Sequence, residues 1–395
     1  MDGRTNMIDN WPLYLLVVAA VASGWWLGRR QPRKPSQSAG LDHYAGLNYL
    51  LNEEPDRAVV RFIQDLTVNP DTLDTHLALG NLLRRRGDVE KAVVVHENIL
   101  KYPVFEQDVI HQVQLELARD YLLAGLLDRA EKLLLELSQL RGAVRLDSLV
   151  LIIELYEREK EWQKAIVAGE RLAVGDEAEK YERAISHYYC ELAMGHMAGR
   201  NIEAARLALR DGIGHDAKNP RTSLVLAELE IQEQRFPEAF KVLRRIKDQD
   251  PVYVPESLPL LRLVSERGGA SAAQVQAYLE QCLLLAPSIS IVLALAQPIR
   301  EVSGDEAMSK FIANHLKRNP TIRGLTQLID LHMDNTQGVA KQNLSILRSF
   351  AEALIANKPV YRCYECGFEG KKLHWHCPIC KRWGSIHAIF GLEGE

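Results

Sequence analysis

From about residue 43 to residue 357 the chain repeats one pattern of apolar and small residues at helical spacing. A small residue returns at one recurring position, at Ala58, Ala92, Ala130, Ala165, Ala204, Ala239 and Ala307. Phe62 and Phe311 follow their alanines by one helical turn, so they lie on the same helix face. Small residues let two antiparallel helices approach closely, while Leu, Tyr and Phe fill the flanks. The pattern predicts an all-α chain of consecutive helix pairs.

A second small position precedes the first by about 12 residues, as tetratricopeptide repeats require, and the period scatters around ~34 residues. It is occupied by Gly46, Gly80, Ala118 and Ala227. Proline ends several units because it cannot continue a helix, at Asn69-Pro70, Asn219-Pro220, Asp250-Pro251 and Asn319-Pro320. The pattern resembles tetratricopeptide repeats. We expect about eight or nine helix pairs over residues 43–357, stacked as an α-solenoid.

The N-terminal part contains an uncharged stretch, residues 11–28, of nearly the length needed to cross a bilayer. Aromatic residues lie toward both of its ends, where they favour the headgroup level: Trp11, Tyr14, Trp25 and Trp26. We therefore predict one transmembrane helix over 11–28. A cleaved signal peptide is the alternative, but the preceding charges are of mixed sign and no small-x-small cleavage site is present.

Basic residues follow this stretch at once, at Arg29, Arg30, Arg33 and Lys34, against Arg4 alone before it. By the positive-inside rule, residues 1–10 face the periplasm and the chain after Gly28 faces the cytoplasm. Residues 29–42 have no apolar period and form a basic juxtamembrane linker. Gly24 and Gly28 form a G-x-x-x-G pattern, which is compatible with helix association. A homodimer is compatible with the sequence.

The composition is that of an ordinary globular protein, with 47% hydrophobic and 25% charged residues. The net charge of −4 argues against a nucleic-acid-binding surface. Arg84–Arg86 and Arg244–Arg245 are interpreted as solvated helix faces. The scattered histidines, His76, His96, His111, His187 and His196, lack mutual ligand spacing and are interpreted as packing or surface residues.

The last segment, residues 358–395, carries four of the six cysteines as two C-x-x-C pairs. Cys363 with Cys366, and Cys377 with Cys380, predict two knuckles whose thiolates hold one metal ion in a tetrahedral set. Disulfides are the alternative, which a cytoplasmic location disfavours. So short a segment cannot fold without additional stabilisation, which a bound metal provides. His374 and His376 could substitute as ligands, but four cysteines already complete the set.

This segment resembles a rubredoxin-like or zinc-ribbon domain, with Lys381 where a second glycine is usual. Iron and zinc both suit four thiolates. A closed coordination set disfavours Lewis-acid catalysis. The ribbon is rich in apolar and aromatic residues: Phe368, Trp375, Trp383, Ile386 and Phe390. We expect some of them to pack on the last helices, which would make the ribbon a structural end-piece of the array.

The order of anchor, repeat array and four-cysteine ribbon resembles the lipopolysaccharide assembly protein B family. WPLYLLVVAAVASGWWLGRR near the start and YRCYECGFEGKKLHWHCPICKRWGSI near the end carry the resemblance. It implies an inner-membrane regulator that presents the deacetylase of the committed lipid A step to the FtsH protease. It also implies binding to a membrane protein that senses lipopolysaccharide, and a rubredoxin-type iron site.

We expect a non-enzymatic adaptor, because the sequence shows no nucleophile–base pair, phosphate loop or open metal site. The alternative is a scaffold that assembles lipopolysaccharide synthesis or transport enzymes without directing proteolysis. RNA binding by the basic, aromatic ribbon and electron transfer at the metal are lesser alternatives.

Overall fold

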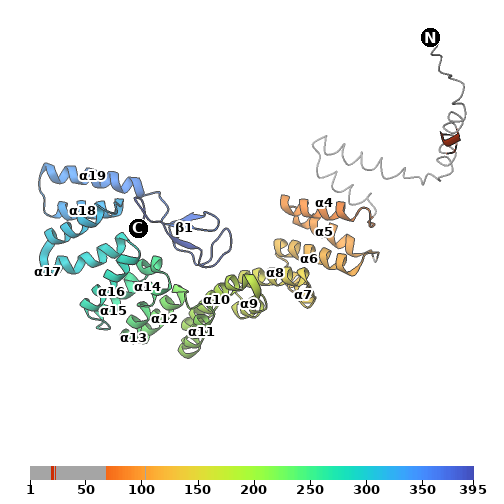
Figure 1. Ribbon diagram of the computed structural model, residues 1–395, viewed down its shortest axis with the longest axis horizontal. Coiled ribbons are helices and arrows are strands. Elements are labelled where there is room, and N and C mark those ends of the chain that lie inside the picture. The colour runs from red at the N-terminus through yellow and green to blue at the C-terminus, as the bar shows by residue number, and fades with distance from the viewer. Residues whose placement is uncertain (1–18, 22, 24–67, 103) are drawn as a thin grey trace, which may run out of the picture. The chain divides into compact units, whose positions relative to one another are not determined.

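The structure is a computed structural model that describes residues 19–21, 23, 68–102 and 104–395 (Figure 1). The chain divides into two compact units, Met1–Asp120 and Tyr121–Glu395. The segments predicted at 1–10 and 29–42, the repeat positions Ala58 and Phe62, and all of 11–28 except 19–21 and 23 lie outside the described residues. Across the described residues, no helix combines the length and apolar character that crossing a bilayer requires.

In the first unit, α4 (Leu73–Arg86) pairs with α5 (Val89–Leu100) through the turn at Gly87, and α6 (Gln107–Ala124) follows. Gly87 adopts φ 88°, a left-handed conformation that glycine takes without strain. Leu83, Ala92 and Val95 are buried together between α4 and α5. The predicted small position at Gly80 is also buried.

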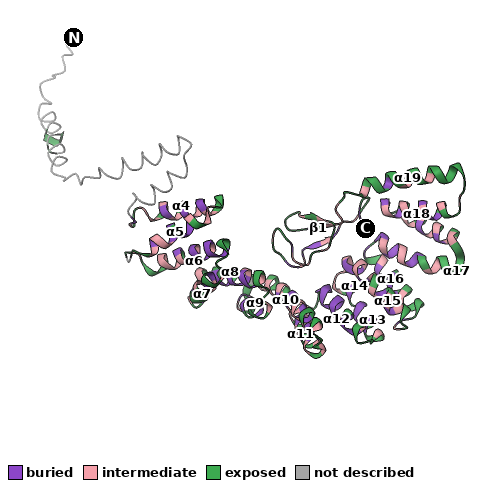
Figure 2. Ribbon diagram, turned by 180° about the vertical axis from the view of Figure 1, so that it is seen from behind, coloured by how far each residue is buried: buried purple, intermediate pink, exposed green. Residues whose placement is uncertain are grey.

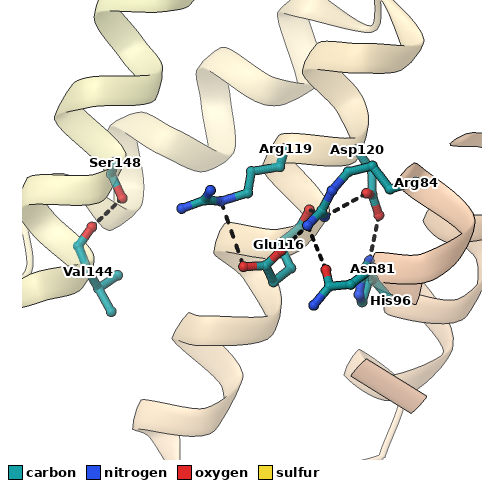
Figure 3. A network of polar contacts seen from close by, with 8 residues as sticks. All are labelled: Asn81, Arg84, His96, Glu116, Arg119, Asp120, Val144 and Ser148. Atoms are coloured by element: carbon teal, nitrogen blue, oxygen red, sulfur yellow. Dashed lines mark hydrogen bonds and ion pairs between the residues drawn. The ribbon is translucent and has the colours of Figure 1, made fainter. Parts of the chain in front are cut away.

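A network of polar side chains joins α4, α5 and α6 (Figure 3). Arg84 Nη1 donates to Asp120 Oδ1 at 2.9 Å, and Arg84 Nη2 donates to Glu116 Oε2 at 2.5 Å. His96 Nδ1 lies 2.5 Å from Asp120 Oδ2, and both side chains are fully buried. The interpretation of Arg84–Arg86 as a solvated face is therefore wrong for Arg84, which the carboxylates of the next helix partly bury. Arg85 and Arg86 are exposed.

The second unit continues the helix pairs after α6. Its helices are α7 (Leu127–Leu137), α8 (Ala143–Glu159), α9 (Trp162–Glu170), η1 (Gly175–Glu177), α10 (Ala178–Ala198), α11 (Ile202–His215), α12 (Pro220–Gln232), α13 (Phe236–Leu243), α14 (Ile246–Gln249), η2 (Pro251–Tyr253), α15 (Val254–Glu266), α16 (Ala272–Leu285), α17 (Ile289–Leu316), α18 (Ile322–Asp334) and α19 (Val339–Ile355). Figure 2 shows buried residues along most of these helices, while α19 is largely exposed.

The recurring small position falls four residues after the N-cap of the second helix of a pair. Ala92, Ala130, Ala165 and Ala239 all occupy it and are fully buried. In α11 the fully buried residue at this position is Ala205, so the assignment of Ala204 is wrong by one residue. The sequence places two alanines side by side there, and only the helix start decides which one faces inward.

The same shift occurs in α17. Gly304 adopts φ 79° and interrupts the helical conformation, which divides α17 into two helices across a kink. Met308, four residues later, is fully buried, whereas Ala307 is only partly buried. A flexible methionine therefore replaces the alanine of the other pairs at this position.

The proline dipeptides start helices as well as ending them. Asn219 caps α12 by accepting from the Arg221 amide at 3.0 Å, and Pro220 is the first helical residue. Asp250 likewise accepts from the Val252 amide at 3.1 Å at the start of η2. Proline fits the first turn of a helix because its missing donor would be unpaired there.

The ribbon follows α19 and contains a three-stranded antiparallel sheet in the order β2-β1-β3. Its strands are β1 (Tyr361–Cys363), β2 (Glu369–Gly370) and β3 (Ile386–Ala388). Cys363 is opposite Ile386 and Arg362 is opposite His387. Cys363, Cys377 and Ile386 form a small buried core of the ribbon.

Candidate metal centre

The first cysteine pair lies on a tight knuckle that β1 leads into. The Gly367 amide donates to the Cys363 carbonyl at 3.0 Å, and the Cys363 amide donates to the Phe368 carbonyl at 2.8 Å. Gly367 adopts φ 75°, which returns the chain toward β2. This turn brings Cys363 and Cys366 to one side of the knuckle.

The second knuckle repeats the same hydrogen bonds. The Lys381 amide donates to the Cys377 carbonyl at 3.0 Å, and the Cys377 amide donates to the Arg382 carbonyl at 2.9 Å. Lys381 adopts φ 57°, in the left-handed region, at the position that corresponds to Gly367. The turn therefore keeps its geometry although the usual glycine is absent, and the lysine adopts a backbone conformation that is strained for a residue with a Cβ atom.

The two knuckles bring the four predicted cysteines together. Their sulfur atoms all lie within 4.8 Å of one another. Cys363 Sγ is 3.7 Å from Cys380 Sγ, and Cys366 Sγ is 3.7 Å from Cys377 Sγ. A tetrahedron with metal–sulfur bonds of about 2.3 Å has edges of about 3.8 Å. The donor set fits one tetrahedrally coordinated ion, and both zinc and iron suit it.

The thiols of the cluster differ in acidity. Burial raises the pKa of Cys363, but hydrogen bonds with Ser385 and with the backbone at 365 and 366 outweigh burial and lower it to about 6. Burial, with contributions from the neighbouring thiols, raises the pKa of Cys380 to about 12. One thiolate thus forms readily, and further negative charge in the cluster needs a cation beside it. A metal ion bound by the four sulfurs would provide that charge.

The two histidines of the ribbon do not join the four sulfurs. His376 Nε2 lies 2.8 Å from the Lys381 carbonyl oxygen, and its ring stacks on Trp383 at a centroid distance of 4.5 Å. The ring of His374 lies beside Phe368, at 6.1 Å between centroids.

Trp383 attaches the second knuckle to the repeat array. Its Nε1 donates to Glu157 Oε1 of α8 at 2.7 Å, and its side chain is almost fully buried. The Tyr188 hydroxyl of α10 donates to the same oxygen at 2.7 Å. The Trp383 ring also meets Tyr188 and Trp162 edge-on, at 5.6 Å and 6.1 Å. Glu157 therefore holds an array residue and a ribbon residue at once.

Trp375 makes the second attachment. Its ring stacks on Tyr253 of η2 at 5.0 Å, and the Tyr253 hydroxyl donates to the Ile386 carbonyl of β3 at 2.9 Å. The guanidinium of Arg221 lies 5.7 Å from the ring centroids of both Trp375 and Trp383, close enough for cation–π attraction. Arg221 is buried and paired with Glu191 at 2.6 Å.

These contacts correct the expected position of the ribbon. The sequence predicts that some of its aromatic residues pack on the last helices, but Trp375 and Trp383 pack on α8, α9, α10, α12 and η2 in the middle of the array. The last helices are contacted by the residues after β3. The Ile322 amide donates to the Leu392 carbonyl at 2.8 Å, and Glu395 accepts from Ser288 Oγ at 2.7 Å and from the Ser290 amide at 3.1 Å.

No sequence pattern indicates Glu157, Arg221 or Tyr253 as partners of the ribbon. Each belongs to a helical segment more than a hundred positions before its partner, as Trp383 with Glu157 and Ile386 with Tyr253 show. The excess of aromatic residues in the ribbon indicated that it packs on something. Only the tertiary structure identifies the surface.

A cavity of about 840 Å³ lies between the second knuckle and the array. Its walls come from α8, α10, the turn before α12, η2 and the ribbon, and they include Glu154, Tyr181, Arg183, Lys218, Asp250, Tyr364 and Lys381. Charges of both signs and several aromatic rings line it. Its volume is within the range of ligand-binding sites, and two of its lining residues, Tyr364 and Lys381, are exposed to solvent.

Comparison with known proteins matches both the array and the ribbon. A family described as rubredoxin metal binding domain matches residues 361–388, and a tetratricopeptide repeat family matches residues 190–253. Lipopolysaccharide assembly protein B of Escherichia coli K12 is 34% identical over 390 residues, which cover 97% of this chain and 99% of that protein. The Haemophilus influenzae protein of the same name is 29% identical over 398 residues, which cover 96% and 98%.

Among solved structures, a tetratricopeptide repeat protein from Parabacteroides merdae aligns with 67% of this chain and 99% of its own. The sequence identity is 14% and the TM-score is 0.33.

Proposed function

Because the chain belongs to the lipopolysaccharide assembly protein B family, we propose that it is a non-enzymatic adaptor that regulates lipopolysaccharide synthesis at the inner membrane. The observation that carries this proposal is similarity over nearly the whole length of chain and relative, at 34% identity. The segment at 11–28 anchors the protein as a single-pass helix, and residues 43–357 face the cytoplasm.

The partners that we propose are those that the family implies. The array binds the deacetylase of the committed lipid A step and delivers it to the FtsH protease. A lipopolysaccharide-sensing membrane protein restrains this delivery. Helix pairs suit such a role because stacked repeats offer an extended surface to partner segments. Anchoring beside the bilayer raises the effective concentration of a bound client near a membrane protease.

We propose that the ribbon binds one iron or zinc ion through Cys363, Cys366, Cys377 and Cys380, and that the ion has a structural role. Two of the four sulfurs belong to buried cysteines, and the site offers no open coordination position for a substrate. The ion fixes the second knuckle, and this knuckle presents Trp375 and Trp383 to the array.

The adaptor proposal is tested by following the half-life of the deacetylase after depletion of this protein. Loss of the adaptor should lengthen that half-life severalfold, and restoring the intact chain should shorten it again. An unchanged half-life rules out delivery to FtsH. If the chain still co-purifies with lipopolysaccharide enzymes in that case, the scaffold alternative is correct.

The cavity beside the ribbon is a testable contact region for the client. Photocrosslinking groups at Tyr181 or Tyr364 should capture the deacetylase in living cells. A group at the exposed Arg200, in the turn between α10 and α11, serves as the matched position outside the cavity. Equal capture from all three positions would remove the cavity from the proposal.

A further inference from the structure

The helix α19 is unusual among the helices that the structure describes. It has 17 residues, yet its only buried residue is Ala351. Large apolar side chains on its surface are at least half exposed: Val339 (72%), Ile346 (52%), Leu347 (55%), Phe350 (62%) and Leu354 (62%). No other described helix carries more than two exposed apolar side chains of this size. Terminal units of a repeat array usually present a polar outer face, and this one does not.

The exposed apolar residues form one continuous stripe. Positions 339, 343, 346, 350 and 353 of α19 alternate in steps of four and three, which is the seam of a heptad pattern. Leu347 and Leu354 lie beside the seam. The charged residues of α19 lie on the opposite side, where Arg348 Nε is 2.5 Å from Asp330 Oδ1 of α18. The stripe therefore lies on the side of α19 that faces away from α18, and it contains no charged residue.

We propose that this stripe is an interface between two copies of the chain, paired as antiparallel helices about a two-fold axis at Phe350. In such an interface each residue at 350 + n meets the residue at 350 − n of the partner. A stripe bearing charge would repel its own copy, whereas this neutral stripe creates no like-charge contact. A second copy as the occupant therefore meets no electrostatic penalty.

The residue order along α19 fits this axis. Ile346 lies opposite Leu354 of the second copy, so two large apolar side chains meet there. Leu347 lies opposite the smaller Ala353.

The apolar area is sufficient for a specific interface. If each of the five large side chains loses roughly 100 Å² of accessible surface, the two copies together bury roughly 1,000 Å². That value is near the lower limit for stable association, so we expect a dimer that dissociates at low concentration.

The first test measures mass against concentration for the full chain in detergent, by sedimentation. The wild type should dimerise, and Phe350→Asp should raise the dissociation constant at least about 30-fold, because it places two like charges at the axis. Leu284→Asp is the matched control, because Leu284 is 87% exposed on α16 and lies outside the stripe. A monomeric wild type, or a Phe350→Asp variant that dimerises like the control, overturns the proposal.

The second test determines whether the two α19 helices pair in antiparallel or parallel orientation. Ile346→Cys and Leu354→Cys variants are mixed with a bifunctional maleimide of about 10 Å span, which matches the spacing of packed helices. The antiparallel arrangement predicts that the mixture crosslinks efficiently while each variant alone does so poorly. Crosslinking of each variant with itself would establish a parallel arrangement and contradict the axis at Phe350. The metal-bound wild-type chain, treated in the same way, measures the background crosslinking through the native cysteines.

Discussion

Lys381 occupies a left-handed backbone position that favours glycine. It adopts φ 57° at the turn after the second cysteine pair, where the first knuckle has Gly367 at φ 75°. A residue with a Cβ atom is disfavoured there by roughly 1 kcal/mol. We therefore expect Lys381→Gly to raise the midpoint of chemical unfolding of the ribbon, followed by tryptophan fluorescence. Gly367→Ala should lower it, and equal midpoints for all three chains would show that the turn carries no strain.

Gly80 is the opposite case, a position where a side chain is excluded by a neighbour. A Cβ atom on Gly80 would lie 2.4 Å from His96 Nε2, and the His96 ring is held by Asp120. We expect Gly80→Ala to lower the free energy of unfolding by about 2 kcal/mol through overpacking, despite the better helix propensity of alanine.

His96→Ala provides the control for this prediction, because it removes the ring that meets the new methyl group. In the His96→Ala background, Gly80→Ala should become neutral or stabilising. An equal cost of Gly80→Ala in both backgrounds would show that the His96 ring is not the cause.

At the scale of elements, we expect the stability of the contact between α10 and the ribbon to depend on pH through His187. Burial lowers the pKa of this histidine well below its usual value, with further contributions from Arg221, Arg183 and His376. Its ring stacks on Trp383 at 5.2 Å and lies near Trp375 at 5.8 Å. The ring is therefore neutral in the folded protein at physiological pH.

The consequence for stability has a definite sign. Below the unfolded-state pKa of about 6.5, the unfolded chain binds a proton that the folded chain excludes, so stability falls as the pH falls. We expect the slope to reach about 1.4 kcal/mol per pH unit for this residue between pH 6.5 and its folded-state pKa. Chemical unfolding at pH 5.5, 6.5 and 7.5 measures it. His187→Phe should flatten the profile, and an unchanged slope would assign the dependence to other groups.

At the scale of the whole molecule, the ribbon connects the four-cysteine cluster to the array. Trp375 and Trp383, on either side of the second cysteine pair, contact the middle of the array. Glu395 accepts hydrogen bonds from Ser288 and Ser290 at the start of α17. We expect Cys363→Ser to abolish metal binding and to lower the melting temperature of the array by several degrees, as metal analysis and calorimetry would show.

Cys282→Ala is the control for this prediction, because Cys282 is a buried cysteine of α16 outside the ribbon. It should keep one metal ion per chain. If Cys363→Ser loses the ion but leaves the array transition unchanged, the ribbon and the array unfold independently.

The sequence predicts a structural feature well when the contacts that determine it join residues close together in the chain. The small residues at Ala92, Ala130, Ala165 and Ala239 were assigned correctly because helix pairing has a fixed period. The assignment failed at Ala204 and Ala307, where helix starts at Asn201 and Gly304 shift the register by one residue. Such starts depend on capping and packing, which a period alone does not encode.

The sequence by itself determined the repeated helix pairs, the four cysteines that approach one another and the membership of the chain in its family. The helix pairs and the cysteine knuckles follow from short spacings, because a knuckle or a helix turn brings residues together within a few positions. The tertiary structure alone decided that Trp383 meets Glu157 and that, among the described residues, α19 keeps its apolar stripe exposed. Those outcomes depend on how distant segments meet in space, and no local spacing records that.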